Sequence, residues 1–254
     1  REAKGHCGPE VMAAVAAKGG RIRPRVSVVK VLASSICIGS GGSVGREGPI
    51  VQICSSMRSA VGQWLRLPED WLRTLVACGA AGGISATFNA PIAGVFFALE
   101  VILGRFMTRS FGFVVVSSVV ADVVAHAFLG DTQSFVVPAY ELVTAWEIPI
   151  YVVLGIAAGV VALAFIYVLY KSEDIFDGWR FPPYLKPAFG GIIIGLIGLY
   201  SLDLFGVGYG GVERALLGDI ALSALLILGA LKLIATSVTI GSGGSGGIFA
   251  PSLF

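Results

Sequence analysis

The chain has 254 residues, of which 56% are hydrophobic and only 13% are charged, and its mean hydropathy is +0.85. Soluble domains carry roughly a quarter charged residues, so this composition excludes an ordinary soluble domain and indicates a membrane protein. The net charge of +2 is too small to indicate a nucleic acid or another strongly acidic partner.

The small residues fit the same setting. The 35 glycines are typical of helices that pack closely in lipid or break within it. Four cysteines lie in apolar or glycine-rich surroundings and form no Cys-x-x-Cys pair: Cys7, Cys37, Cys54 and Cys78. We interpret them as packing residues and expect neither a disulfide framework nor a metal site. The sequence indicates no cofactor.

The first part of the chain predicts short helices joined by a basic loop. A helix at Pro9–Lys18 is too short to cross a membrane, and further helices are predicted at Pro24–Ile38, from Pro49 to about Leu65, and after Leu67–Asp70. The segment Lys18–Lys30 carries five basic residues, which places it in the cytoplasm by the positive-inside rule. The alternative is a basic loop without topological meaning.

No residue in the stretch Thr74–Leu99 is charged, and the stretch is long enough to cross a bilayer. Because Gly82–Gly83 and Phe88–Pro91 interrupt it, we predict two short helices that meet within the membrane. Asn89 is interpreted as a cap for the second of these helices, with a direct contact to substrate as the alternative.

Phe111–Leu129 is also long enough to span a bilayer, and it holds Asp122 and His126 four residues apart on one helical face. An ionisable pair inside a membrane is a candidate functional site. Nothing else in the sequence converges on this pair, so we interpret it as a helix-end or helix-packing contact.

The second half of the chain predicts a polar loop followed by spans and connections. In order, these are a surface loop at Asp131–Glu147, an uncharged span at Ile148–Tyr170, an interfacial connection at Lys171–Lys186, a short span at Ala188–Tyr200, a re-entrant or loop segment at Phe205–Gly211 and a last span at Leu222–Ile240. The whole chain thus predicts an all-α, polytopic membrane fold of about nine or ten helical pieces that are uneven in length and partly broken or re-entrant.

Glu47 is a lone carboxylate within a glycine-rich loop, Gly39–Pro49, that lies between two apolar runs. Pro49 is well placed as the first residue of a new helix, which leaves the N–H groups after Gly48 pointing back toward the loop. The positive end of a helix dipole favours an anion, so we predict an anion site here. The alternative is a glycine-rich turn with a solvated Arg–Glu pair.

A second loop of the same kind, Gly241–Pro251, follows the last apolar run, and a third candidate, Gly5–Glu10, opens the chain. Two glycine-rich breaks inside hydrophobic segments are typical of the discontinuous helices with which transporters direct half-helix N-termini at an anion near the membrane midplane. This repetition favours the anion-site interpretation of the Glu47 loop.

The three glycine stretches resemble, in order and spacing, three motifs of the CLC family of chloride channels and chloride/proton antiporters. Gly45–Pro49 matches the family's Gly-Lys/Arg-Glu-Gly-Pro motif, Gly247–Pro251 matches its Gly-x-Phe-x-Pro motif, and Phe88–Gly94 resembles the junction after the second motif. The resemblance covers essentially all of residues 1–254. It implies a single transmembrane anion-transport domain in the cell (inner or plasma) membrane, and a homodimer with a separate path for chloride or a related anion in each subunit.

By this resemblance Glu47 is the gating glutamate, whose carboxylate occupies an anion position when ionised and swings away when protonated. The N–H groups of Ile248 and Phe249 are similar to the family's main-chain anion ligands, which agrees with anion binding at helix N-termini, and Arg46 lends positive potential near the mouth. The full set implied for anion binding is Gly247, Ile248, Phe249, His6, Arg46 and Gly48.

The first motif departs from the family pattern. Where the family usually has Gly-Ser-Gly-Ile-Pro, this chain has Gly-His-Cys-Gly-Pro at Gly5–Pro9, so His6 replaces the serine that helps to hold the central anion. A histidine can still donate an N–H to an anion, but it indicates no halide preference. A family tyrosine beyond Phe254 and the helices before the first motif are missing, so we expect a fragment that lacks the first and last helices of the family fold.

Proton coupling in the family's antiporters requires a second, inner glutamate. Alignment from Phe88–Pro91 places Val101 at that position and Glu100 one residue earlier, and one residue turns a side chain by about 100° on an α-helix. We interpret Glu100 as a helix-end acid that pairs with Arg105 or lies at the interface. The valine favours a passive chloride channel gated by Glu47. The alternative is a chloride/proton antiporter, since some coupled members also lack the glutamate.

Two other classes of function fit the sequence less well. A phosphate- or nucleotide-binding membrane enzyme would use the glycine loops as phosphate cradles, but neither loop ends in Gly-Lys-Ser/Thr or lies in a strand–turn–helix unit, and no acidic cluster indicates Mg²⁺. A structural membrane scaffold would not require Glu47 in such a loop. We therefore expect a transport protein rather than an enzyme.

Overall fold

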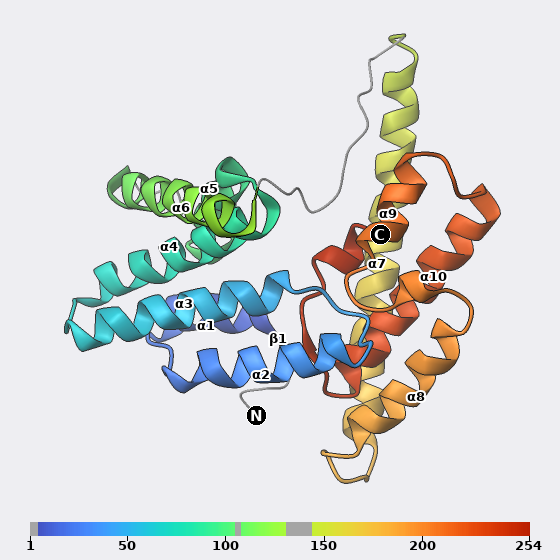
Figure 1. Ribbon diagram of the computed structural model, residues 1–254, viewed down its shortest axis with the longest axis horizontal. Helices are drawn as coiled ribbons and strands as arrows, with labels where there is room; N and C mark the ends of the chain where they lie inside the picture. The colour runs from blue at the N-terminus through green and yellow to red at the C-terminus, as the bar shows by residue number, and fades with distance from the viewer. Residues whose placement is uncertain (1–4, 105–107, 131–143) are drawn as a thin grey trace. The chain divides into compact units, whose positions relative to one another are not determined.

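The computed structural model describes residues 5–104, 108–130 and 144–254, and the chain divides into two compact units (Figure 1). Unit 1 comprises Arg1–Ser40, Gly45–Ser134 and Ser245–Phe249, and unit 2 comprises Gly41–Val44, Phe135–Gly244 and Ala250–Phe254. The described residues form ten α-helices and two strands of two residues each. This confirms the predicted all-α fold of uneven helical pieces. Most of the surface loop predicted at Asp131–Glu147 lies outside the described residues.

The described part of unit 1 contains α1–α6 and both short strands. Its elements are β1 (Gly5–His6), α1 (Cys7–Ala17), α2 (Arg25–Gly39), α3 (Glu47–Trp64), α4 (Glu69–Phe88), α5 (Pro91–Phe97), the π-helix η1 (Ala98–Ile102), α6 (Thr108–Leu129) and β2 (Ser245–Gly246). Helix α4 packs between α3 and α6, and α2 packs on the other side of α3 (Figure 1). Prolines open α2, α4 and α5 close to the predicted positions, because a proline at or before the first turn loses no helical hydrogen bond.

Small residues allow the neighbours of α4 to approach it closely. Four of them are buried in the apolar core of the unit: Ala77, Cys78, Ala80 and Ala81. An added Cβ at Gly79 would lie 2.6 Å from the carbonyl oxygen of Cys54 in α3. The predicted break at Gly82–Gly83 is wrong, because α4 runs through both glycines, which pack against α6 and α3 respectively.

Helix α4 ends at the Phe88–Pro91 junction, as predicted, but Asn89 does not cap the helix that follows. Asn89 is the C-cap of α4 in the left-handed conformation (φ 55°, ψ 46°), and its N–H donates to the Ser85 carbonyl. Ala90 is the N-cap of α5. Asparagine tolerates the left-handed conformation better than most residues, which explains its place at the end of α4.

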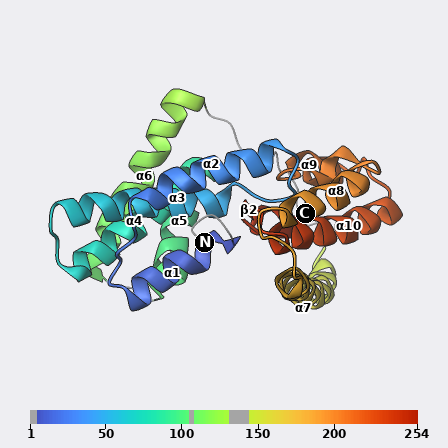
Figure 2. The same ribbon diagram turned by 90° about the horizontal axis from the view of Figure 1, so that it is seen from below.

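The described part of unit 2 is built around two long helices. Its elements are α7 (Glu147–Gly178), α8 (Lys186–Gly198), the 3₁₀-helix η2 (Leu202–Leu204), α9 (Tyr209–Leu216), α10 (Leu222–Gly241) and the 3₁₀-helix η3 (Ala250–Ser252). Helix α10 packs against α7 and α8, and Figure 2 looks nearly along the axis of α7. An added Cβ at Gly241 would lie 2.5 Å from the Ser172 hydroxyl oxygen of α7, so a glycine is needed at this contact.

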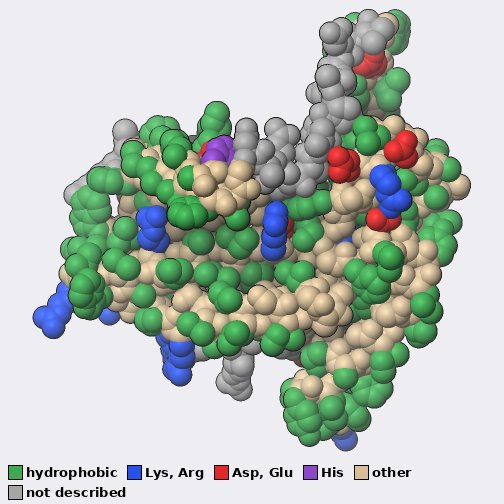
Figure 3. Space-filling view, viewed as in Figure 1, with side chains coloured by type: hydrophobic (Ala, Val, Ile, Leu, Met, Phe, Trp, Pro, Cys, Tyr) green, Lys and Arg blue, Asp and Glu red, His purple; other side chains and the backbone are tan. Residues whose placement is uncertain are grey.

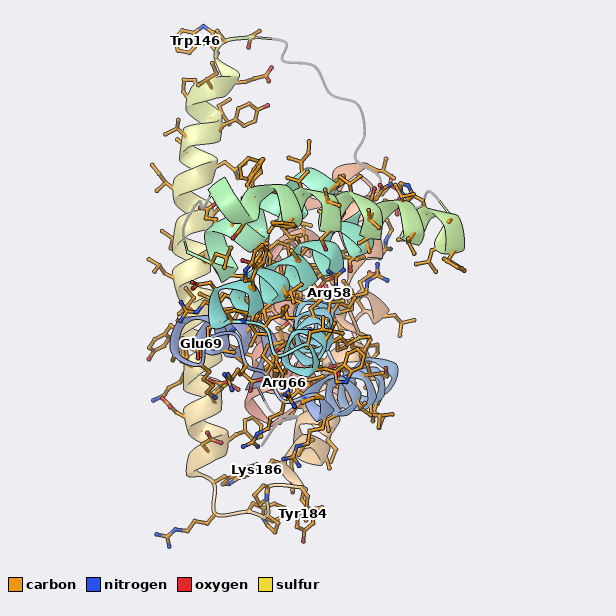
Figure 4. The ribbon with its side chains drawn as sticks, turned by 90° about the vertical axis from the view of Figure 1, so that its left-hand side faces the viewer. Arg58, Arg66, Glu69, Trp146, Tyr184 and Lys186 are labelled. Carbon is orange, nitrogen blue, oxygen red and sulfur yellow. The ribbon has the colours of Figure 1, made fainter. Side chains whose placement is uncertain are left out.

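Helix α7 is longer than predicted, with 32 residues. The interfacial connection predicted at Lys171–Lys186 is therefore wrong for its first half, which is helical as far as Gly178. Trp146 and Tyr184 are 81% and 79% exposed, and they lie at opposite ends of α7 (Figure 4). Exposed aromatic residues at both ends of an apolar helix are typical of the two surfaces of a membrane.

Three described helices are long and apolar enough, by length and composition, to cross a membrane: Ser110–Leu129, Glu147–Gly178 and Leu222–Gly241. Three further apolar helices have only 10–17 residues, and at 1.5 Å per residue they are too short to cross alone. Large hydrophobic side chains are exposed on both units (Figure 3), as expected for surfaces that face lipid.

Candidate functional site

Glu47 lies at the N-terminus of α3 and is only 1% exposed. The helix begins at Glu47 with Arg46 as its N-cap, so Pro49 is the third helical residue rather than the predicted first. A negatively charged side chain in the first turn is stabilised by the helix dipole. The carboxylate of Glu47 therefore lies inside the protein at the positive end of a helix, while the neighbouring Arg46 is exposed.

The second and third glycine motifs are joined by two backbone hydrogen bonds. The Gly45 N–H donates to the Gly247 carbonyl and the Gly247 N–H donates to the Gly45 carbonyl, both at 2.7 Å. An added Cβ at Gly48 would lie 2.9 Å from the Gly247 Cα atom, so the two backbones approach to a distance that excludes larger residues. The Gly247 N–H already donates to the Gly45 carbonyl. Gly247 therefore contributes to the site by allowing the two backbones to approach closely.

The first motif joins the same place through β1. Gly5 pairs with Ser245 and His6 with Gly246 in a parallel two-stranded sheet. The Cys7 thiol donates to the Gly246 carbonyl at 3.7 Å, across 239 residues of sequence. The side chain of His6 lies outside the described part of the structure, so its contact with an anion stays a prediction. The backbones of all three motifs nevertheless converge within unit 1.

The N–H groups of Ile248 and Phe249 are the predicted main-chain anion ligands. These two residues are the last of the third motif that belong to unit 1. Ile248 is half-buried and Phe249 is 46% exposed. The Phe249 ring packs edge-on against Phe88, with centroids 5.8 Å apart. This contact ties the third motif to the α4–α5 junction. The role of the two N–H groups as ligands stays a prediction.

Two polar residues of α2 that face these motifs were not predicted from the sequence. Lys30 is fully buried and lies near the Cys7 thiol of the first motif. One turn later Ser34 is also buried, and its hydroxyl lies 3.1 Å from that of Ser245. The basic loop predicted at Lys18–Lys30 is therefore wrong at its end. The four-residue spacing of Lys30 and Ser34, which places both on one face of an apolar helix, is the signal that could have found them.

A cavity of about 400 Å³ lies beside the second motif in unit 1, with a polar lining from Arg46, Asn89, Asp122 and His126. The His126 Nε2 atom lies 2.7 Å from Asn89 Oδ1, and the Ser85 hydroxyl donates to Asp122 Oδ1 at 3.5 Å. These contacts tie α6 to α4 and its cap, which agrees with the helix-packing interpretation of Asp122 and His126.

Glu100 and Val101 lie in η1, which is a π-helix rather than an α-helix. The Leu103 N–H donates to the Ala98 carbonyl, five residues back, at 3.0 Å, and the side chains of Glu100 and Val101 are both exposed in unit 1. A rotation of about 100° per residue belongs to the α-helix and does not hold in this wider turn. The direction of the Glu100 side chain therefore differs from the one expected for an α-helix, and whether Glu100 stands at the inner proton position stays a prediction; Arg105, its expected partner, lies outside the described residues.

Within unit 2, one face of α10 holds the residues just before the second motif. The Ser43 N–H donates to the Thr239 hydroxyl at 3.1 Å, and the hydroxyls of Ser43 and Thr236 are 3.4 Å apart. Lys232, one turn before Thr236, is 1% exposed and donates to the Gly206 carbonyl at 2.9 Å. This polar face is a second feature that the apolar sequence of the helix did not predict.

A family model described as Voltage gated chloride channel matches residues 1–254, the full chain. The chain belongs to the CLC family. This CLC chain is 34% identical, over 249 residues, to a putative chloride channel protein ClcB-like of Ralstonia nicotianae, covering 96% of the chain and 58% of that relative.

Two solved CLC structures share the fold. One, of a CLC-type fluoride/proton antiporter, is 26% identical with a TM-score of 0.84, and the match covers 96% of this chain and 62% of that one. The other, of a slow cyanobacterial Cl⁻/H⁺ antiporter, is 28% identical with a TM-score of 0.86, covering 98% and 60%. This CLC chain is thus an integral membrane protein that spans less than two thirds of the length of each protein it matches here.

Proposed function

We propose that the protein containing this chain exchanges a small anion, with chloride as the expected substrate, for protons across a membrane. Anion transport is supported by one observation above all, the convergence of three glycine motifs at the buried Glu47. Exchange is supported by the two solved structures, which are described as antiporters. These structures favour the chloride/proton antiporter over the passive channel that Val101 indicates.

Glu47 is the gate in this proposal. When ionised, its carboxylate occupies an anion position at the positive end of α3, where the helix dipole stabilises it. When protonated, it loses the charge that held it there and leaves the position to chloride. One residue thereby links the uptake of a proton to the passage of an anion.

The surrounding residues bind the anion and supply positive potential. The N–H groups of Ile248 and Phe249 act as main-chain ligands, as N–H groups at helix N-termini do for other anions. Lys30, buried next to the first motif, and Arg46, next to Glu47, attract the anion through their charge. His6 donates an N–H from the first motif, in place of the serine of other family members.

Glu100 is the candidate for the second proton carrier. It lies in the π-helix η1, which packs against α1, the helix that begins in the first motif. Short π-turns inside helices occur frequently at functional sites. In this wide turn the carboxylate of Glu100 takes the role that Val101 cannot perform, and hands protons toward Glu47.

Liposomes that contain the purified full-length protein test exchange directly. Under a chloride gradient without a pH gradient, the exchanger should drive protons uphill, in a direction that reverses with the chloride gradient. Glu47→Gln and Glu100→Gln should each abolish proton movement. The same change at an exposed acid of α4, Glu69→Gln, should leave it intact. Chloride movement without any proton movement in the wild type would contradict exchange and establish the passive channel that Val101 favours.

We also propose that the protein is a homodimer in the inner or plasma membrane of the cell, with one anion path in each subunit. The family resemblance supports this assembly. Cross-linking of the full-length protein in native membranes should yield a dimer, and a product that remains monomeric at every cross-linker length would contradict it.

A further inference from the structure

A second cavity of unit 1, of about 530 Å³, includes neither Glu47 nor any residue of the second and third motifs. It is lined by α1, the α1–α2 loop, the start of α2 and Gln52 of α3. Its charged lining residues are three cations and one acid: Lys18, Arg21, Arg23 and Glu10. The cavity is therefore net positive, in a loop that the sequence predicts to be cytoplasmic.

Helix α3 holds the basic loop in a fixed shape. The Ser59 hydroxyl donates to the Gly20 carbonyl at 2.7 Å and accepts from the Ile22 N–H at 2.9 Å. The Gln63 side chain donates to the Ile22 carbonyl at 2.8 Å. Ile22 is buried, whereas Arg21 and Arg23 on either side of it are exposed. The two guanidinium groups thus extend from a backbone that is ordered before a ligand arrives, which lowers the entropic cost of binding.

The wall of this cavity also offers hydrogen-bond acceptors. Gln52 is 2% exposed, and its Nε2 donates to the Glu10 carboxylate. Its Oε1 atom is buried and receives no hydrogen bond from the residues that the structure describes. Buried amide oxygens are nearly always paired with protein groups or ordered water, so this atom is an acceptor that the donor group of an occupant can use. The cavity therefore combines cations for an anionic group with acceptors for a donor group.

The α1–α2 loop, which lines one side of the cavity, reaches the turn between α3 and α4. The Arg21 guanidinium is 4.0 Å from the Glu69 carboxylate, and both groups are exposed, so the pair is weak and can exchange partners. Figure 4 shows Glu69 and Arg66 at this turn. Trp64, two residues before Arg66, is 82% exposed. An exposed tryptophan among basic residues is typical of the level of the lipid headgroups.

We propose that this cavity binds the headgroup of an anionic phospholipid whose headgroup alcohol donates hydrogen bonds, the chemistry of phosphatidylglycerol. Lys18, Arg21 and Arg23 bind the phosphate, and a headgroup hydroxyl donates to Gln52 Oε1. A choline headgroup has no such donor, so phosphatidylcholine satisfies only the phosphate half of the site. This lipid site does not depend on the exchange activity proposed above.

Native mass spectrometry of the purified full-length protein, titrated with phosphatidylglycerol or phosphatidylcholine in mixed micelles, tests the site. We expect one phosphatidylglycerol to bind each chain more tightly than phosphatidylcholine does. Arg21→Gln should weaken its binding about fivefold, the effect of one cation near an anionic lipid. Gln52→Leu should remove the preference over phosphatidylcholine. Arg66→Gln is the matched control, because it makes the same charge change at an exposed residue outside the cavity, and it should leave binding unchanged.

Three outcomes would overturn the proposal. Equal losses in Arg21→Gln and Arg66→Gln would show only a general attraction to anionic lipid. Unchanged lipid binding in both Arg21→Gln and Lys18→Gln would exclude the cavity as the binding site. Lys18 is exposed just after α1, so Lys18→Gln serves as the test if Arg21→Gln does not fold. Displacement of the lipid by free glycerol 3-phosphate would show that the site takes a soluble phosphate ester.

Discussion

Replacing Gly247 by alanine tests whether the second and third motifs must touch. The added Cβ would lie 2.8 Å from the Gly48 nitrogen, 3.2 Å from the Gly48 Cα atom and 3.3 Å from the Gly45 carbonyl oxygen. All three are backbone atoms, so no side chain can rotate away. The two loops must separate by at least about 0.6 Å to reach an ordinary contact of 3.4 Å.

That separation would lengthen and weaken both 2.7 Å hydrogen bonds between Gly45 and Gly247. At about 0.5–1.5 kcal/mol for each bond, their loss should lower the free energy of unfolding by about 1–3 kcal/mol, which is also the usual cost of overpacking. For a chain of this length, each kcal/mol shifts the Tm by about 2–4 °C. We therefore expect a Tm lower by several degrees.

Thermal unfolding in detergent, at one scan rate for every variant because such unfolding is often irreversible, measures this change. Gly8→Ala is the matched control, since Gly8 belongs to the first motif but an added Cβ there meets nothing within 4 Å. Alanine is also the better helix former, so this variant should be at least as stable as the wild type. Chloride flux in liposomes should fall in Gly247→Ala alone. Equal stability and flux in the two variants would refute the required contact.

Three further substitutions test single contacts. Lys30→Met removes a buried cation that attracts the anion, so the apparent chloride affinity should fall, on the order of tenfold for a loss of about 1.4 kcal/mol. An unchanged chloride dependence of flux would exclude this role. Lys232→Met leaves the Gly206 carbonyl without its donor and should lower the free energy of unfolding by about 1–3 kcal/mol, whereas a wild-type Tm would count against the contact. Asn89→Ala should lower the Tm for two reasons: alanine is less stable than asparagine at a φ of 55°, by about 1–2 kcal/mol, and the variant loses the contact with His126. Asn89→Gly should retain more stability than Asn89→Ala. The reverse order would contradict the role of Asn89 as a left-handed cap.

The positions of the helices could be predicted because they depend on local properties of the sequence. Apolar runs long enough to cross a bilayer predicted the membrane-spanning helices, and prolines such as Pro68 and Pro91 predicted where helices begin. The Gly82–Gly83 prediction failed because a glycine is also the residue that allows helices to pack closely in a membrane protein. Whether such a glycine breaks a helix or packs it depends on the neighbouring helix, which the local sequence does not contain.

The contacts within the site could be predicted only in part. Helix N-termini and glycine loops indicated an anion site at Glu47, but the pairing of Gly45 with Gly247 joins segments about 200 residues apart and depends on the tertiary fold. Lys30 was missed because a lysine near other cations is usually solvated. The π-turn at Glu100 leaves no signal in a sequence of apolar residues, so the sequence predicted an α-helix where the structure has a π-helix.

The pH dependence of chloride flux in the wild type and in Glu47→Gln, measured in the same liposomes, tests most directly whether Glu47 is the gate. Wild-type flux should rise as the pH falls, because protonation removes the tethered carboxylate from the anion path. Glutamine keeps the shape of the side chain and carries no charge at any pH. Glu47→Gln should therefore conduct chloride at least as fast as the wild type, at a rate independent of pH. A variant that retained the wild-type pH dependence would show that another residue is the gate.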